Sequence, residues 1–236
     1  MSATQELLGP VLAGNAAKPL ITYYDDATGA RVELSGATTA NWAAKTANWL
    51  VDELDVEPGT PVAVDLPAHW QTAGVLLGAW WCGAHVVGDP DGAELAVVAA
   101  SDPARGAGAR TVAAVGLDAL GAPVRDLPDG VLDYATEIRV HGDDFSPLLP
   151  VPADTPALLG HSAGELVAAA RERAAGLGLS AGDRVLSTVE WTLPGGVLDG
   201  LLAVLAAGAS LVHCAHADPA LLERRRADER TTARLA

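Results

Sequence analysis

The sequence lacks several features that mark whole classes of protein. Only two cysteines occur among its 236 residues, Cys82 and Cys214, and both lie in apolar runs. A secreted chain held together by disulfides would carry more, so a disulfide framework is excluded. There is no run of about 18 uninterrupted apolar residues, and no basic N-terminal region followed by an apolar one. We therefore predict neither a membrane span nor a signal peptide, and we expect a cytoplasmic protein.

Basic residues and aromatic residues are also scarce. There are 15 Lys and Arg against 30 Asp and Glu, which gives a formal net charge of −15. An acidic surface repels phosphate backbones, so we do not expect a nucleic-acid partner. Aromatic residues make up 4% of the chain, whereas hydrophobic residues make up 50%. Ala, Val, Leu and Gly dominate, which is typical of helices packed on a sheet, and the length allows a sizeable core.

An internal repeat organises what is present. Each copy has the pattern of a strand, a loop, a buried helix, a glycine and a second strand. Gly182 follows Gly59 by 123 positions, and Gly208 follows Gly83 by 125 positions, so the offset is nearly constant. Gly83 and Gly208 fall where a helix ends, which favours left-handed helix caps. The copies span residues 57–87 and 180–212.

The pattern predicts an α/β fold with two similar doubly wound lobes. A helix precedes each copy, at residues 38–54 and 164–175. Short apolar runs indicate strands covered on both faces. These predicted strands lie at 84–87, 95–100, 111–115 and 209–212. We expect a first lobe at 1–126, a linker rich in Pro, Gly and Asp at 127–152, and a second lobe at 153–236.

Several segments, in order along the chain, resemble a known superfamily. Residues 56–63 resemble its G-V-x-P-G-D-x-V-A run, 77–84 its L-A-x-x-K-A-G-A run, and 177–187 its L-G-L-T-P-x-D-R-V-L-S run. The set resembles the large N-terminal domain of the adenylate-forming superfamily, which includes acyl-CoA synthetases, luciferase-like enzymes and nonribosomal adenylation domains. The resemblance covers the chain from about Ile21 onward and implies two related α/β lobes.

The chain departs from that superfamily at the position that matters most for catalysis. Adenylation needs a Gly/Ser/Thr-rich loop with a lysine, S-G-T-T-G-x-P-K-G, whose backbone N–H groups hold the ATP phosphates. This loop should follow residues 156–159, but the chain passes directly to 160–166, which resembles the segment after the loop. The later ribose-binding and catalytic motifs have no counterpart up to Ala236. The resemblance therefore implies a truncated, degenerate homologue, non-catalytic or remnant, with no cofactor.

Ser162 supports an alternative function. It lies in a G-x-S-x-G motif between an apolar strand and a helix, as the nucleophile of a serine acyltransferase or esterase would. In sequence order, its acid and base could come only from Asp199 with His213 or His216. The other interpretation is that Ser162 caps the following helix and forms a capping box with Glu165.

A ligand cleft is expected near Trp191 and Thr192. They follow the strand at 184–188, where the superfamily places the loop that lines its acyl pocket. Ligands of open α/β sheets bind outside the carboxyl ends of strands. We therefore predict that His161, Trp191 and Thr192 line a cleft between the lobes. Alternatively, Trp191 fills the space of the missing loop and the cleft is collapsed.

Three other clusters indicate structural roles. The segment 213–216 offers His and Cys ligands but no second pair, so no metal site is predicted. Trp80 and Trp81 are expected in the core, and Arg224–Arg226 on a solvated helix face. Residues 231–236 look like the start of a strand, and an uncovered sheet edge there would favour a homodimer or a protein partner.

Overall fold

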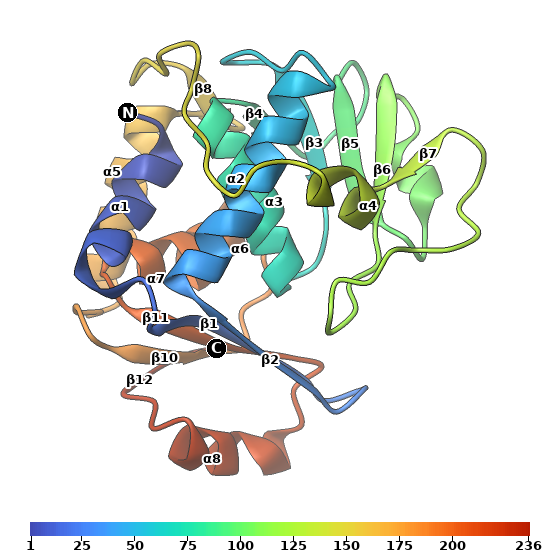
Figure 1. Ribbon diagram of the computed structural model, residues 1–236. Coiled ribbons are helices and arrows are strands. Elements are labelled where there is room, and N and C mark those ends of the chain that lie inside the picture. The colour runs from blue at the N-terminus through green and yellow to red at the C-terminus, as the bar shows by residue number, and fades with distance from the viewer.

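The computed structural model describes residues 1–236 and contains two sheets with helices packed between and around them (Figure 1). The smaller sheet has five strands in the order β12-β10-β11-β1-β2, all parallel except β2, which is antiparallel to β1. Its strands are β1 (Pro19–Asp25), β2 (Ala30–Ser35), β10 (Arg184–Ser187), β11 (Ser210–Ala215) and β12 (Ala233–Leu235).

The larger sheet has seven strands in the order β7-β6-β5-β3-β4-β8-β9, all parallel except the last pair. The chain moves from β3 to β4 on one side and then crosses to β5 on the other, so the strand order reverses beside β3. The strands are β3 (Pro61–Asp65), β4 (His85–Val87), β5 (Leu95–Ala99), β6 (Thr111–Val115), β7 (Val131–Asp133), β8 (Pro156–Leu158) and β9 (His161–Ser162). The predicted α/β fold with two parallel-rich sheets is confirmed.

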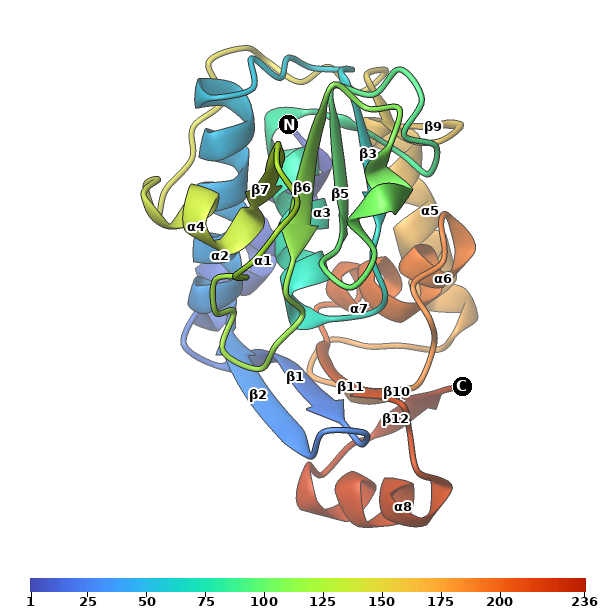
Figure 2. The ribbon, with the colours of Figure 1, turned by 90° about the vertical axis from the view of Figure 1, so that its right-hand side faces the viewer.

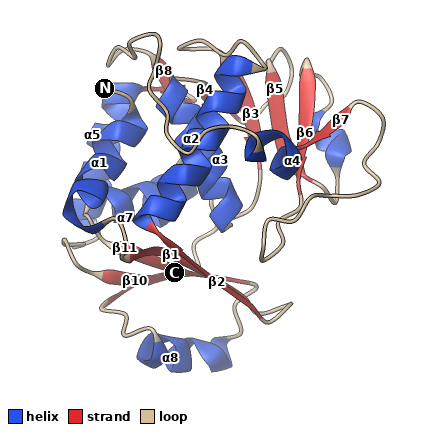
Figure 3. Cartoon of the chain, viewed as in Figure 1, coloured by secondary structure: helices blue, strands red, loops and turns tan.

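The helices join the two sheets into one body (Figure 3). The helix α3 is buried almost all round and contacts β1 of one sheet and β4 of the other. By contrast, α8 lies alone on the far side of the five-stranded sheet (Figures 1 and 2). None of the helices is long and apolar enough to cross a membrane. The helices are α1 (Ala3–Asn15), α2 (Gly36–Asp52), α3 (Trp70–Cys82), η1 (Pro103–Gly106), α4 (Tyr134–Arg139), α5 (Ala163–Gly176), α6 (Gly195–Val197), η2 (Leu198–Leu202), α7 (Ala203–Ala206) and α8 (Pro219–Asp228).

The predicted lobe boundaries do not follow the two sheets. The β1–β2 hairpin comes from the first part of the chain but pairs with β11, and β8 comes from the second part but pairs with β4. A core cluster of 51 buried residues joins the two sheets. The expected linker at 127–152 also contains β7 and α4. Local composition could not reveal this exchange, because the partner strands are far apart in the sequence.

The internal repeat is confirmed by its hydrogen bonds. The N–H of Gly59 donates to the carbonyl of Gly83 at 2.8 Å, and the N–H of Gly182 donates to the carbonyl of Gly208 at 3.3 Å. Gly59 and Gly182 share a φ of 89°, and Gly83 and Gly208 have φ of 89° and 69°. A residue with a Cβ is disfavoured at such angles, so these glycines allow the same turns in both copies. The predicted helices and strands appear as α2, α5, β4, β5, β6 and β11.

Candidate functional site

A cleft opens where the carboxyl ends of β3 and β5 meet the loop that follows β10. Its volume is about 510 Å³. This is the edge of the seven-stranded sheet at which the strand order reverses, the usual position of ligands in open α/β sheets. We call it the inter-sheet cleft. Its walls come from residues 64–67 after β3, Gly88 after β4, residues 99–105 after β5, and residues 190–193.

The charged side chains of the inter-sheet cleft are mostly acidic. Asp65, Asp102 and Glu190 line it, together with a single cation, Arg105. The guanidinium of Arg105 forms an ion pair with the carboxylate of Asp65. Asp102 and Glu190 form no ion pair, and the cleft carries a net negative charge. No local pattern predicted this grouping, because its members come from three separate segments of the chain.

Trp191 forms the inner wall of the cleft and is only 4% exposed. Behind it lies a buried row of rings, in which Trp191 packs against His213 at 5.7 Å between centroids. Tyr23 stacks on His213 at 6.1 Å and meets His69 edge-on at 4.4 Å. Tyr23 and His213 are adjacent because β1 and β11 pair in that register. No sequence pattern predicted that His69 and Tyr23 belong to this row.

Burial sets the charge of the row. It lowers the pKa of His69 and of His213 to about 4, so both imidazoles are neutral at pH 7. Burial also raises the pKa of the Tyr23 hydroxyl, and the nearby charges of Asp25 and Glu190 raise it further. Neither ring nitrogen of His213 hydrogen-bonds to a protein atom, and neither does Nε2 of His69. The row is thus an uncharged interior with unpaired ring nitrogens behind an acidic cleft.

The helix after the cleft loop is shaped around Trp191. Its first part is α6, followed by the π-helical turn η2 and then α7. A Cβ added at Gly200, within η2, would lie 2.7 Å from Nε1 of Trp191. Wider turns of this kind are found at functional sites more often than elsewhere. Glycine at this position lets the indole pack closely against the helix.

Of the three residues predicted to line a cleft, two line the inter-sheet cleft and one does not. Trp191 and Thr192 line the inter-sheet cleft. His161 lies on β9, is half-buried, and is not among the residues that line that cleft. Trp191 is buried, and the cleft beside it is open.

Ser162 is a helix cap in this structure. Its hydroxyl accepts from the N–H of Glu165 at 3.4 Å and donates to the Glu165 carboxylate at 2.9 Å, and the Ser162 N–H completes the capping box. The proposed triad is not assembled. Asp199 faces Arg173 at 3.5 Å, and His216 binds Asp25 at 2.8 Å. No histidine hydrogen-bonds to the Ser162 hydroxyl, and its carboxylate partner Glu165 is held in the capping box, so the predicted triad does not activate Ser162 as a nucleophile.

The connection from β8 to β9 consists of two residues, Leu159 and Gly160. Leu159 adopts a left-handed backbone conformation, with φ of 47°. Its N–H donates to the carbonyl of Val86 at 3.0 Å, and its own carbonyl contacts Nε2 of His85 at 2.8 Å. This tight turn occupies the position at which the sequence comparison expected a phosphate loop to be missing.

The remaining predictions have mixed outcomes. Trp80 is in the core, as predicted, and its indole N–H donates to the carbonyl of Ala157 at 2.8 Å. The prediction of a solvated arginine face is wrong for Arg225, whose side chain is 12% exposed. Arg225 forms an ion pair with Asp26 and lies over the ring of Tyr24, 4.3 Å from its centroid. No group of three or more His, Cys, Asp and Glu side chains is close enough to hold a metal ion.

Comparison with known proteins places the chain in a family. No family model matches it. A "TIGR03089 family protein" of Mycobacterium tuberculosis (strain ATCC 25618 / H37Rv) is 49% identical over 233 residues, which cover 96% of this chain and 95% of that protein. The chain belongs to the TIGR03089 family. The similarity extends over nearly the whole of both chains, so the cleft, the buried row and the β8–β9 turn all lie within the matched length.

Solved structures show which fold this TIGR03089 family member has. An acyl-CoA synthetase of Brucella canis matches with a TM-score of 0.79 at 17% identity, over 99% of this chain and 47% of that one. The N-terminal domain of FACL13 from Mycobacterium tuberculosis matches with a TM-score of 0.68 at 18% identity, over 100% of this chain and 62% of that one. The chain thus has the fold of the front part of acyl-CoA synthetases and spans about half the length of the synthetase chain.

Proposed function

We propose that this TIGR03089 family member is a non-catalytic scaffold that keeps the ligand cleft of the adenylate-forming fold but does not activate carboxylic acids with ATP. One observation carries the proposal: β8 passes to β9 through Leu159 and Gly160 alone. Two residues cannot form a loop whose successive N–H groups surround phosphates. The N–H of Leu159 is already bonded within the sheet, to Val86.

The charges of the cleft support the same proposal. A bound triphosphate needs several cationic or N–H donors, because burying its charge without them is unfavourable. The inter-sheet cleft has one cation, Arg105, which is already paired with Asp65. The only lysines of the chain are Lys18 and Lys45, and neither lines this cleft. A ligand here is therefore expected to be uncharged or positive, without phosphate groups.

Pyrophosphate exchange tests the loss of activity. The purified chain, incubated with ATP, magnesium and a panel of carboxylic acids, should give no exchange above the buffer rate. A full-length acyl-CoA synthetase assayed in parallel shows that the acids and conditions are adequate. Robust exchange by this chain would refute the proposal.

Thermal denaturation tests nucleotide binding separately. A ligand that binds only the native state raises the melting temperature once its concentration exceeds Kd. We expect no measurable shift at millimolar ATP and magnesium. A shift of several degrees that disappears in Trp191→Ala would show that the cleft still holds nucleotide.

Assembly with a second copy also remains a prediction. β12 is an edge strand, paired only with β10, so its other side is free to pair with another chain. Light scattering over a range of concentrations measures the mass, and a monomer at high micromolar concentration would contradict it. We also propose a cytoplasmic location, which the two unpaired cysteines support.

A further inference from the structure

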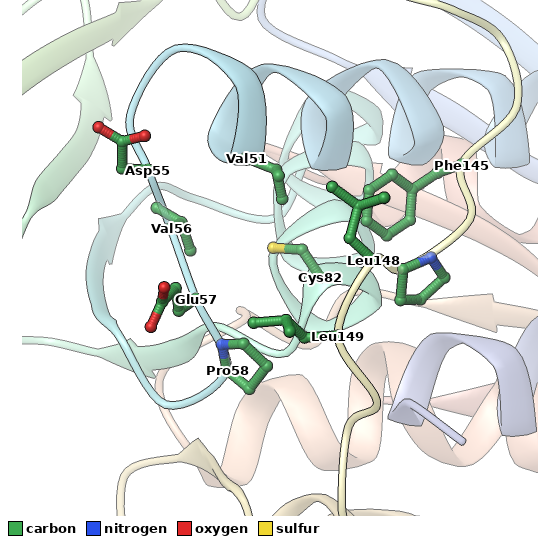
Figure 4. Close-up of a pocket in the computed structure, with 10 residues that line it drawn as sticks. Val51, Asp55, Val56, Glu57, Pro58, Cys82, Phe145, Leu148 and Leu149 are labelled. Carbon is green, nitrogen blue, oxygen red and sulfur yellow. The ribbon is translucent and has the colours of Figure 1, made fainter.

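A second, apolar pocket lies on another face, against the C-terminal end of α3 (Figure 4). Its volume is about 280 Å³. One wall is the turn between α2 and β3, at residues 55–58, and the other contains Phe145, Leu148 and Leu149. The thiol of Cys82 faces the space between the two walls (Figure 4). We call it the strap pocket, after the strap formed by residues 143–149.

The first part of the strap is held firmly. Lys45 pairs with Asp143 at 2.9 Å, and the side-chain amide of Asn48 donates to the carbonyl of Asp144 at 2.9 Å. Phe145 packs edge-on against Trp81, with 6.0 Å between the ring centroids. These contacts fix the base of the pocket wall on α2 and α3.

The second part of the strap is presented to solvent. Residues 146–149 make no hydrogen bond with the rest of the chain. Leu148 is 85% exposed and Leu149 is 49% exposed, although both line the pocket. Leu148 and Leu149 therefore extend the apolar lining of the pocket onto the surrounding surface, as an exposed apolar patch. Exposed apolar patches of this kind mark interaction sites.

The rim of the strap pocket is negative. Asp55 and Glu57 line it, and neither forms an ion pair. Lys45, which holds the strap, is already paired with Asp143. A second copy of this chain, with a net charge of −15, would bring more negative charge to the same rim. Charge complementarity therefore favours a basic occupant.

We propose that the strap pocket is a docking site for a segment of a partner protein that presents an apolar side chain beside lysine or arginine. The apolar side chain enters the hollow over Cys82 and packs against Leu148 and Leu149. The basic group lies at the rim with Asp55 and Glu57. This is the arrangement by which an amphipathic helix binds a groove. The site is separate from the inter-sheet cleft and does not depend on what that cleft binds.

The test uses a labelled amphipathic helical peptide made of Leu and Lys, with a matched peptide of Leu and Glu. Fluorescence anisotropy should show binding of the Lys peptide only. We expect Glu57→Lys to raise its Kd at least tenfold, and Leu148→Asp to do the same. Leu148 is mostly exposed, so its substitution should leave the fold intact.

A matched control separates docking from general attraction to an acidic protein. Glu172 is exposed on α5 and forms no ion pair, and Glu172→Lys changes the net charge by the same amount as Glu57→Lys. The Kd should change less than twofold in this control. Equal weakening by both substitutions would overturn the proposal, because it would show attraction without a site.

Leu149→Cys gives a local readout, because this position lines the pocket and is 49% exposed, whereas the native thiols of Cys82 and Cys214 are buried. Bound Lys peptide should slow the modification of the introduced thiol by methyl methanethiosulfonate at least fivefold. If the peptide binds but leaves this rate unchanged, it binds elsewhere and the proposal fails. If decylammonium slows the reaction and the peptide does not, the pocket takes small amphiphiles rather than a protein segment, and the proposal also fails.

Discussion

The two copies of the repeat have the same ends and different middles. Both begin at a glycine with φ of 89° and end at a left-handed glycine, and the same pair of N–H and carbonyl groups joins the two ends. Between them, α3 is one continuous helix of 13 residues, whereas the second copy is divided into α6, η2 and α7. The two copies thus share the turns that connect sheet and helix, and they differ in the helix between those turns, which in the second copy follows the loop of the inter-sheet cleft.

The difference teaches where the fold can accept a functional loop. In the second copy the loop after β10 carries Trp191, and small residues in the following helix make room for it. A Cβ at Gly196 would collide with the carbonyl of Glu190, and one at Gly200 would collide with Trp191. In the first copy the close approach lies elsewhere, because Gly78 faces α2 instead of a loop. In both copies a glycine lies where the helix packs most closely on its neighbour, which is α2 in the first copy and the loop after β10 in the second.

The largest effect on folding stability should come from lowering the pH. In the second copy, β11 places His213 in the interior, and His69 lies near it. Each has a folded pKa of about 4, below the unfolded value of about 6.5. The unfolded state therefore binds more protons, so stability is intact above pH 6.5 and is lost as pH falls toward 4. Each histidine should contribute a loss of up to about 3 kcal/mol over that range.

His213→Leu separates the two contributions. We expect the slope of the unfolding free energy against pH to fall by up to about 1.4 kcal/mol per pH unit between pH 6 and pH 4.5. Urea denaturation at stepped pH measures it. An unchanged slope would mean that His213 is already charged, or exposed, in the folded protein.

The next effect tests the tight contact of the first copy. A Cβ at Gly78 would lie 2.5 Å from Cβ of Thr46 and 2.7 Å from the carbonyl of Ala43. Gly78→Ala should therefore lower the unfolding free energy by about 2–3 kcal/mol, although alanine favours helix. The control is Gly14→Ala in α1, where nothing outside the helix lies within 4 Å of the added Cβ. That change should be neutral or stabilising by up to about 1 kcal/mol. Equal results at the two sites would show that α3 is not tightly packed on α2.

A smaller effect on stability should distinguish Gly83 from Gly208, the glycines that end the helices of the two copies. Gly83→Ala and Gly208→Ala both put a Cβ on a left-handed residue, which costs about 1–2 kcal/mol. At Gly83 the added atom would also lie 2.9 Å from Val151 and 3.2 Å from Pro58, whereas at Gly208 its closest neighbour is 3.6 Å away. Chemical denaturation should therefore rank Gly83→Ala as the more damaging by about 1 kcal/mol. The reverse ranking would contradict the described packing.

The smallest expected effect concerns the helices in front of each copy. Ser35 caps α2 and Ser162 caps α5, each accepting from a backbone N–H in the first turn. Replacing either by alanine should lower stability by about 1 kcal/mol. Ser162→Ala should leave labelling by a fluorophosphonate probe at the background of the unmodified protein. Labelling that depends on Ser162 would restore the hydrolase hypothesis and would show that a base reaches this serine in solution.

Local patterns in the sequence predicted the parts of the fold that depend on local interactions. The repeat, the helix before each copy and the cap at Ser162 each depend on residues within a few turns of one another. The exchange of strands could not be predicted this way, because apolar alternation shows that a strand exists but not which strand it pairs with. The exposure of Arg225 was predicted wrongly because its neighbours in the sequence are charged, whereas its partner Asp26 lies about 200 residues earlier in the chain. The cleft carboxylates were missed for the same reason.

The strand exchange has a consequence for how the chain reaches its fold. β1 pairs with β11, and Tyr23 stands opposite His213, roughly 190 residues later. On the ribosome, β1 and β2 emerge long before β11, the central strand of their sheet. Such non-local pairing is slow, and it leaves the apolar residues of β1 without their partner strand in the meantime. The negative net charge of the chain limits self-association of the β1–β2 hairpin at this stage, because copies of the nascent chain repel one another. The N-terminal hairpin is therefore the part of the molecule whose ordering should report that folding is complete.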